Sequence, residues 1–308
     1  MRRKNNMGNS FRLRANTMFN RIDEEQKEEP LKIVFLSVEG NKTEKQYFQY
    51  VEKYREKLGI KREVHIHTLQ RAKNDNLSAP ENVLELLEEY LDIRNDCNLP
   101  QRLKAVIPEE YSVEFIESYL KGEHKRRDIK TKEFEAVLQE AGIDLTYQYF
   151  LNEYKGNGND DIFGIVIDRD YHSHSVKQMK DIVSQCCSKS YNCYITTPLF
   201  EFWLLMHLVD IKEIYAGELD KFIVNENLTD KHTFTSKEVS KIAKHSKAIS
   251  EQKFLEYYLP KIDFAIRQAK ENFTMDLDEL IGEDSSADSK MGKLGTNIPE
   301  LFELLREA

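Results

Sequence analysis

Residues 31–48 read LKIVFLSVEGNKTEKQYF, and this stretch decides the fold. Its first eight residues form an apolar, β-branched run, which predicts a strand buried on both faces, as in parallel sheets. The polar residues that follow predict a turn, and a helix is expected from about Thr43. Thr43 with Gln46 three positions later fits a capping box at the start of that helix. The stretch therefore predicts a strand–turn–helix unit.

Similar units follow along the chain. Residues 162–168, IFGIVID, predict a second buried strand, and shorter strands are expected at 63–69 and 191–196. Helical patterns alternate with these strands: from Pro80, in two stretches across 109–142, at 175–188, from Pro198 and from Pro299. The alternation predicts an α/β fold with a parallel sheet flanked by helices.

The pattern divides the chain into three parts. We expect a flexible basic arm over residues 1–29, because this segment lacks periodicity and its first 21 residues hold six Arg or Lys and no acid. The α/β core is expected over 30–210, with a helical insertion at about 75–155. A helical C-terminal region is expected over 211–308, with only helix and loop beyond residue 210.

Composition excludes several classes of protein. With 45 Lys and Arg against 54 Asp and Glu, the 308-residue chain has a net charge of −9, which argues against nonspecific coating of nucleic acid. The longest apolar run, around 200–209, is shorter than the roughly 20 residues that span a bilayer. The first residues lack the apolar segment of a secretory signal, and the four cysteines form no CxxC pair. A cytoplasmic protein without membrane association is expected.

Acidic residues follow two of the predicted strands. Glu39 comes after the first strand, and Asp168 and Asp170 end the strand at 162–168. In open α/β sheets the carboxyl ends of the strands form the ligand-binding edge. Because alternate residues of an extended chain point the same way, Asp168 and Asp170 are expected to face one point. Three carboxylates there predict a site for Mg²⁺ or Mn²⁺.

Other polar residues near this edge are also candidates for the site. Lys42 and Thr43 precede the first helix and would form an anion-binding turn, or else a solvated side chain and a simple cap. Glu201 lies in an apolar helix, so its carboxylate must face a metal, a cation or water. His172 follows the aspartates and would act near a phosphate as a cation or proton shuttle. For Arg169 a structural salt bridge is expected.

Two further histidine interpretations concern zinc and the core. The common zinc-binding spacings are not matched by the candidate histidines and cysteines, which are His172, His174, His65, His67 and the Cys186–Cys187 pair. His207 is not in register with Glu201, so a hydrogen-bonded core histidine is expected there.

Four segments together resemble the RloB-like family, in the family's order: VEGNKTEKQYF (38–48), VIDRD (166–170), TPLFEFWLLMHL (197–208) and GTNIPELFELL (295–305). The resemblance implies a Toprim-type core, as in topoisomerases, primases and OLD-group nucleases, whose acidic residues bind divalent metal. By this resemblance Glu39 matches the Toprim glutamate, which is also interpreted as a general acid or base. Asp168 and Asp170 match the DxD motif, and Glu201 matches the acidic residue of the family's FE motif.

The expected function combines both lines of reasoning. It is Mg²⁺- or Mn²⁺-dependent hydrolysis of phosphodiesters in DNA or RNA, with Glu39, Asp168 and Asp170 on the metal and Glu201 in support. The resemblance implies a role in anti-phage defence, with an ABC-type ATPase partner or self-association. Because the chain has no GxxxxGK[ST] motif, ATP hydrolysis would come from another protein. The helical segment 90–155 is the candidate docking element for self-association or the ATPase partner. The alternative function is a non-catalytic subunit that binds nucleic acid or a partner.

Overall fold

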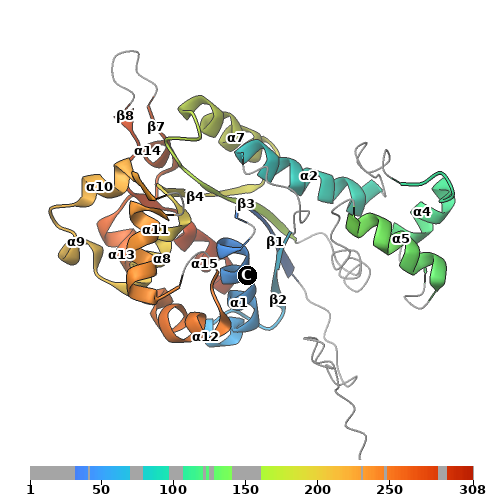
Figure 1. Cartoon of the computed structure of the whole chain (residues 1–308), viewed down its shortest axis with the longest axis horizontal. Helices are drawn as coiled ribbons and strands as arrows, with labels where there is room; N and C mark the ends of the chain where they lie inside the picture. The colour runs from blue at the N-terminus through green and yellow to red at the C-terminus, as the bar shows by residue number, and fades with distance from the viewer. Residues whose placement is uncertain are drawn as a thin grey trace, which may run out of the picture.

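The structure is a computed structural model that describes residues 32–40, 42–69, 79–96, 107–120, 123–124, 128–140, 161–229, 232–245, 248–283 and 290–307. Within these ranges the largest sheet has five strands in the order β2-β1-β3-β4-β9 (Figure 1). They are β1 (Lys32–Val38), β2 (Val64–Thr68), β3 (Ile162–Asp168), β4 (Asn192–Thr197) and β9 (Gly295–Thr296). The first four pair in parallel and β9 is antiparallel to β4. The predicted α/β class is confirmed.

The strand order reverses between β1 and β3. On one side β1 pairs with β2, with Lys32 opposite Val64, and on the other side with β3, with Val34 opposite Ile162. In open α/β sheets, ligands bind at the carboxyl ends of the strands where the order reverses. Glu39 follows β1 and Asp168 ends β3, so the fold places both at this point.

Helices cover both faces of the sheet (Figure 1), and alternate residues of β1 belong to different hydrophobic cores. Val34 and Leu36 belong to the core formed with α1 (Thr43–Lys53), α8 (Phe200–Leu208), α13 (Ile262–Asn272) and α15 (Ile298–Glu307). Ile33 and Phe35 belong to the core formed with α2 (Pro80–Asp96), α7 (Val176–Ser188) and α14 (Leu277–Ile281). Burial on both faces explains why β1 and β3 read as continuous apolar runs.

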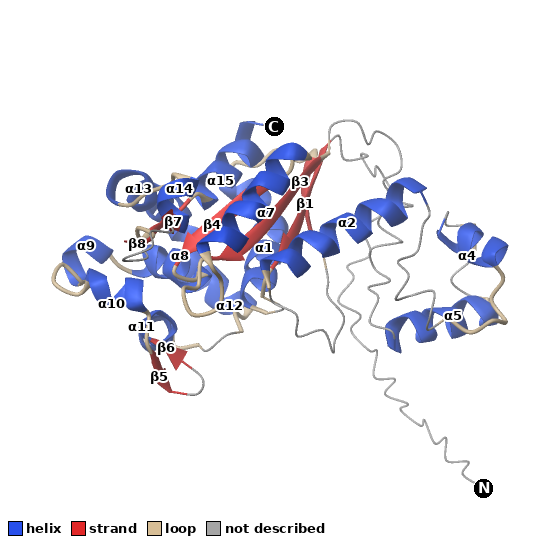
Figure 2. Ribbon diagram, turned by 90° about the horizontal axis from the view of Figure 1, so that it is seen from above, coloured by secondary structure: helices blue, strands red, loops and turns tan. Residues whose placement is uncertain are grey.

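The predicted insertion contributes α2 and two shorter helices, α4 (Val113–Leu120) and α5 (Ile129–Glu140). We call α4 and α5 the α4–α5 pair; it lies beyond the end of α2 that is remote from the sheet (Figure 2). The remaining short elements are η1 (Arg55–Leu58), α9 (Ile211–Ile214), α10 (Leu219–Val224), β5 (Asn227–Thr229), β6 (His232–Thr233), α11 (Phe234–Ala243), α12 (Glu251–Lys253), η2 (Phe254–Tyr258), η3 (Leu259–Lys261), β7 (Gly282–Glu283) and β8 (Lys290–Met291).

Two local predictions are wrong. The residue before α1 is Lys42 rather than Thr43, and the side chain of Lys42 makes no capping hydrogen bond. Gln46, the expected partner in the box, instead accepts a hydrogen bond at Oε1 from the N–H of Ile249, at 2.8 Å. Beyond residue 210 the chain also contains short strands, β5 to β9, whose two or three residues are too few to show a period of two. The predicted arm, residues 1–29, lies outside the described residues.

Candidate metal centre at the strand ends

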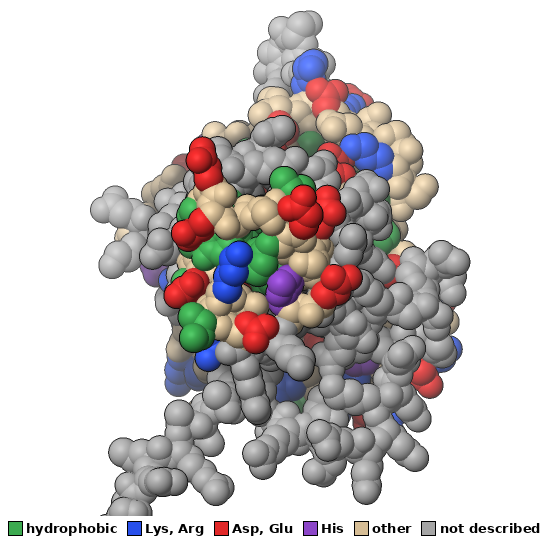
Figure 3. All heavy atoms as spheres, turned by 90° about the vertical axis from the view of Figure 1, so that its right-hand side faces the viewer, with side chains coloured by type: hydrophobic (Ala, Val, Ile, Leu, Met, Phe, Trp, Pro, Cys, Tyr) green, Lys and Arg blue, Asp and Glu red, His purple; other side chains and the backbone are tan. Residues whose placement is uncertain are grey.

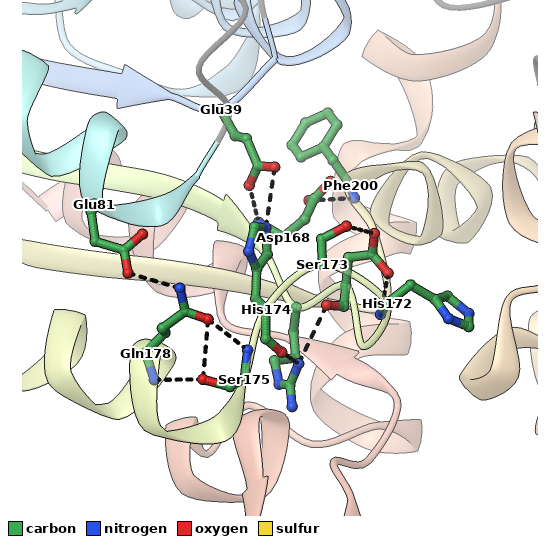
Figure 4. A network of polar contacts seen from close by, with 11 residues as sticks. Glu39, Glu81, Asp168, His172, Ser173, His174, Ser175, Gln178 and Phe200 are labelled. Atoms are coloured by element: carbon green, nitrogen blue, oxygen red, sulfur yellow. Dashed lines mark hydrogen bonds and ion pairs between the residues drawn. The ribbon is translucent and has the colours of Figure 1, made fainter.

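Glu39 and Asp168 are joined directly across the two central strands. The N–H of Glu39 donates to the carbonyl of Val166 at 3.0 Å, which continues the β1–β3 ladder past the end of β1. The N–H of Asp168 donates to Glu39 Oε2 at 2.9 Å (Figure 4). Residues 129 positions apart in sequence therefore meet because their strands are parallel neighbours.

Asp168 is buried among other carboxylates. Its Oδ1 accepts a hydrogen bond at 2.8 Å from the N–H of Phe200, the first residue of α8. Burial raises the pKa of Asp168 well above its ordinary value, and the negative charges of Glu39, Glu44 and Glu201 raise it further. A carboxylate held in this way is stabilised by any cation that binds beside it.

Glu44 belongs to the same cluster. It lies in the segment 38–48 that resembles the family, and the helix dipole alone also favours an acidic residue in the first turn of a helix. It is buried in the first turn of α1, and its charge acts on Asp168. A Cβ atom at Gly40 would lie 1.8 Å from Glu44 Oε2, so only glycine lets this carboxylate pack against the turn after Glu39. The sequence spacing could have indicated this position, because the turn and the first residues of α1 between Glu39 and Glu44 bring the two carboxylates side by side.

Glu201 also faces the cluster, as expected for an acidic residue in an apolar helix. It is half-buried in the first turn of α8, and its charge contributes to the raised pKa of Asp168. The same charge acts on Tyr258, whose pKa is raised mainly by burial and secondly by Glu201. We call Glu39, Glu44, Asp168 and Glu201 the strand-end cluster.

The side chain of Asp170 takes part in the turn that follows β3. Its Oδ1 accepts from the N–H of His172 at 3.0 Å, and its Oδ2 accepts from Ser173 Oγ at 2.7 Å. Because β3 ends at Asp168, the alternation of an extended strand does not continue to Asp170. The structure therefore does not bring these two carboxylates together through the strand period, and the metal role of Asp170 stays a prediction.

Of the two histidines after the aspartates, His174 is the one beside the cluster. Its Nε2 lies 3.7 Å from Glu39 Oε1, and the side chain is buried. The ring of His172 is exposed and points away from Glu39 and Asp168 (Figure 4), with Nε2 3.0 Å from the carbonyl oxygen of Val224. From the sequence, His172 rather than His174 was expected to act in the site, because spacing alone does not show that the turn at Asp170 separates the directions of the two rings.

Lys42 and Thr43 lie on either side of the start of α1. The Lys42 side chain is exposed, whereas Thr43 is buried as the first residue of the helix. Their predicted role in anion binding is neither supported nor excluded by these positions and stays a prediction.

Arg169 is buried but forms no ion pair with a described carboxylate, so the expected salt bridge is wrong. Its Nε donates to the carbonyl of Ile281 at 2.9 Å and its Nη1 to the carbonyl of His174 at 2.7 Å. The guanidinium carbon lies 4.2 Å from the centre of the Tyr171 ring. Burial lowers the pKa of Arg169. The residue thereby attaches the turn after β3 to the end of α14.

His207 is the hydrogen-bonded core histidine that the sequence predicted. Its Nδ1 lies 2.9 Å from the carbonyl oxygen of Trp203, and because a carbonyl only accepts, Nδ1 carries the proton. Its Nε2 therefore accepts from the hydroxyl of Tyr47 at 3.1 Å. Burial lowers the pKa of His207 to about 3, so the ring is neutral at physiological pH.

The donor set of the strand-end cluster suits a hard divalent ion, because it consists of carboxylate oxygens. The described residues, however, hold no three His, Cys, Asp or Glu side chains close enough to form a ready metal-binding group. The described hydrogen bonds of Glu39 and Asp168 use one carboxylate oxygen each, Oε2 and Oδ1. The residues fit Mg²⁺ or Mn²⁺ by chemistry, and binding would require their side chains to converge further.

Comparison with protein families gives one match. The family model described as RloB-like protein matches residues 34–305, which is most of the chain. The chain therefore belongs to the RloB-like family, as the four sequence segments predicted. It matches no curated protein and no solved structure. None of the described helices has the length and apolar composition needed to cross a membrane.

Proposed function

We propose that this RloB-like protein is a divalent-metal-dependent nuclease of Toprim type that hydrolyses phosphodiesters of DNA or RNA. One observation carries the proposal: Asp168 is buried and its N–H donates to Glu39 Oε2 at 2.9 Å where the strand order reverses. Burial raises the pKa of Asp168, and the charges of Glu39, Glu44 and Glu201 raise it further. Such a concentration of carboxylates at a ligand-binding edge is what a cation site needs.

In this proposal the carboxylates have separate roles. Asp168, Asp170 and Glu39 would hold Mg²⁺ or Mn²⁺. The ion supplies Lewis-acid polarisation of the phosphate and activation of water. Glu39 moves a proton at Oε1, the oxygen that faces His174 at 3.7 Å. Glu201 and Glu44 supply the negative charge for a second ion or keep the first one bound.

The biological setting is proposed from the family resemblance. The protein acts in the cytoplasm in anti-phage defence, with an ABC-type ATPase partner or as a homo-oligomer. Lys42, Thr43 and His172 are the candidates for contact with substrate phosphates. Activity of the isolated chain is expected to be weak, because a protein with net charge −9 binds nucleic acid poorly by itself.

The second candidate is a non-catalytic subunit that binds nucleic acid or a partner protein. The observation that favours it is the lack of a ready three-residue metal-binding group in the described part of the chain. The two candidates differ in one respect: only the nuclease needs the charge of Asp168 for its action.

The test is to incubate the purified protein with Mg²⁺ or Mn²⁺ and a mixture of DNA, ribosomal RNA and tRNA. Discrete products are expected from the wild type and none from Asp168→Asn, which keeps the side-chain oxygen that accepts from Phe200. The matched control is Asp181→Asn, an exposed carboxylate on α7 that pairs with Lys177. Equal cleavage by Asp168→Asn and the wild type would contradict the nuclease.

A further inference from the structure

A cavity lies on the α10–α11 side of the molecule. It has a volume of about 480 Å³ and is lined by Asp220, Lys221, Val224, Glu226, Leu228 and Phe234. These residues come from α10, the turn after it, β5 and the first residue of α11. The volume falls in the range of sites that hold small organic groups.

The apolar part of the cavity wall is formed by Val224, Leu228 and Phe234. Val224 and Leu228 are 40% and 41% exposed, so their side chains are accessible to a ligand. The Phe234 ring packs edge-on against Phe222, with ring centres 4.9 Å apart. Between the walls, Asn225 has a left-handed backbone conformation, and its Oδ1 accepts from the N–H and the hydroxyl of Thr235 at 3.0 and 2.8 Å. The cavity is therefore a preformed aromatic and aliphatic slot.

The charges at its edge select against a phosphate inside it. Asp220 and Glu226 contribute two carboxylates. The cation there, Lys221, pairs with Glu218 at 3.0 Å and lies 5.9 Å from the centre of the Phe234 ring. Carboxylates accept hydrogen bonds from exocyclic amino groups of bases, and a phenyl face stacks on any base. The preferred occupant is thus a flat, uncharged ring that carries an amino group.

A hydrogen bond connects the cavity wall to the turn that follows β3. The exposed His172, four positions after Asp168, lies with Nε2 3.0 Å from the carbonyl oxygen of Val224 in the cavity wall. Because the carbonyl only accepts, His172 donates from Nε2. The turn after β3 thereby joins the two sites, and Figure 4 shows its two histidines diverging, His174 toward Glu39 and His172 away from it.

We propose that this cavity binds an amino-bearing nucleobase of a single-stranded nucleic acid whose phosphodiester lies at the strand-end cluster. The proposal rests on the proposed nuclease function and names the substrate class: unpaired strand with cytosine, adenine or guanine at the position next to the reacting phosphate. Thymine and uracil, which lack the amino group, fit the carboxylates less well.

The test is fluorescence anisotropy with the full-length protein in Ca²⁺ and three labelled ten-nucleotide probes: oligocytidine, oligothymidine and an abasic strand of equal length. The wild type is expected to bind oligocytidine at least about tenfold more tightly than the abasic strand, the size of one base stacked on an aromatic ring. Oligothymidine is expected to lie between them.

Variants distinguish a base site from general attraction to the strand. Leu228→Asp is expected to remove the preference for oligocytidine over the abasic strand. Ile214→Asp is the control, because Ile214 is 59% exposed on α9, carries the same charge change and does not line the cavity. Glu226→Gln is expected to reduce the preference for oligocytidine over oligothymidine while the abasic strand binds as before. Thermal unfolding of each variant checks its folding.

The outcomes separate this inference from the nuclease proposal. Wild-type protein that cleaves nucleic acid but binds all three probes equally would overturn the base site alone. Equal behaviour of Leu228→Asp and Ile214→Asp would do the same. Wild-type protein that neither binds a probe nor cleaves any nucleic acid would overturn both proposals.

Discussion

The strand-end cluster and the α4–α5 pair are built in opposite ways. The four carboxylates of the cluster come from the ends of β1 and β3 and the first turns of α1 and α8, so the cluster exists only when the whole core is folded. The α4–α5 pair is held by a local aromatic group, in which Phe134 contacts Tyr111, Phe115 and Tyr119 at ring distances of 4.8 to 5.3 Å. The strand-end cluster thus depends on segments that are far apart in the sequence, whereas the α4–α5 pair depends on segments that are close together in the sequence.

The surfaces of the two regions differ as well. Figure 3 shows the end of the molecule where the α4–α5 pair lies, with hydrophobic side chains, a basic side chain and a histidine surrounded by acidic ones. Lys130 lies 4.6 Å from the centre of the Phe115 ring, and Val113 and Ile129 are 67% and 76% exposed. The cluster is enclosed by comparison. From this contrast we expect that the α4–α5 pair can change without affecting the strand-end cluster.

The largest effect is expected from Phe134→Ala. Phe134 is fully buried at the centre of the aromatic group, and removing such a ring costs about 3–5 kcal/mol. Hydrogen exchange should show faster exchange in α4 and α5, while the amides of β1 and β3 keep their protection. Faster exchange of the β1 and β3 amides would show that the two regions are not independent.

Glu39→Gln tests the other side of the comparison. The substitution keeps the size of the side chain and an oxygen that accepts from Asp168, but it removes the charge and the basicity. Nuclease activity should fall by at least ~10²-fold, or about 2.7 kcal/mol in activation free energy. Phe134→Ala is the control and should keep its metal-dependent activity. A Glu39→Gln enzyme with wild-type rates would remove Glu39 from the mechanism.

The pH dependence of stability is a third test, because the core next to the cluster contains the neutral His207. Its pKa of about 3 lies below the value of about 6.5 in an unfolded chain. As the pH falls below 6.5 the unfolded chain binds a proton that the folded protein does not bind. Stability is therefore present at neutral pH and is lost toward pH 3, by about 2 kcal/mol between pH 7 and pH 5 for this group.

Urea unfolding of His207→Gln at both pH values checks this sign. The variant is expected to be less stable at pH 7 but to lose about 2 kcal/mol less than the wild type on acidification. His124→Gln, in the loop between α4 and α5, should follow the wild type. An identical loss in His207→Gln and the wild type would show that His207 does not carry the dependence.

Glu201→Gln should have the smallest effect on cleavage. Glu201 is half-buried, and its charge is the smallest of the three carboxylate contributions to the raised pKa of Asp168, so activity is expected to fall by less than about tenfold, or about 1.4 kcal/mol. Steady-state rates at several Mn²⁺ concentrations would measure it. A loss as large as that of Glu39→Gln would place Glu201 directly on a metal.

Much of the fold was predictable because its main strands are buried on both faces. The apolar runs of β1 and β3 and the β-branched residues of β4 indicated strands without reference to the rest of the chain. The two residues of β9 could not be found, since their pairing with β4 depends on a contact between Thr196 and Thr296 far along the chain. The predicted capping box at Thr43 does not form, because the side chain of Gln46 accepts a tertiary hydrogen bond from the N–H of Ile249 instead.

The strands and helices that supply the site residues were predictable from the sequence, but the directions of the side chains were not. Glu39, Asp168 and Glu201 were expected together, and the structure brings their charges together. Glu44 was missed because an acid in a first helical turn has a sufficient local reason, the helix dipole. The Asp170 carboxylate accepts hydrogen bonds within the turn after β3, and the ring of His172 points away from Glu39 (Figure 4), so the predicted roles of both residues stay predictions. Side-chain direction after a strand end depends on the turn, which periodicity does not describe.

The central claim is that the strand-end cluster is a cation site, and thermal unfolding of the wild type and Asp168→Asn with and without Mn²⁺ tests it most directly. Since the folded pKa of Asp168 is raised, its ionised form costs stability at neutral pH, and the cost disappears as the pH falls to the ordinary carboxyl range. Without metal at pH 7, Asp168→Asn should therefore unfold at a higher temperature than the wild type. Added Mn²⁺ should raise the unfolding temperature of the wild type and leave that of Asp168→Asn unchanged. A lower unfolding temperature for metal-free Asp168→Asn, together with an equal Mn²⁺ shift in both proteins, would contradict the claim.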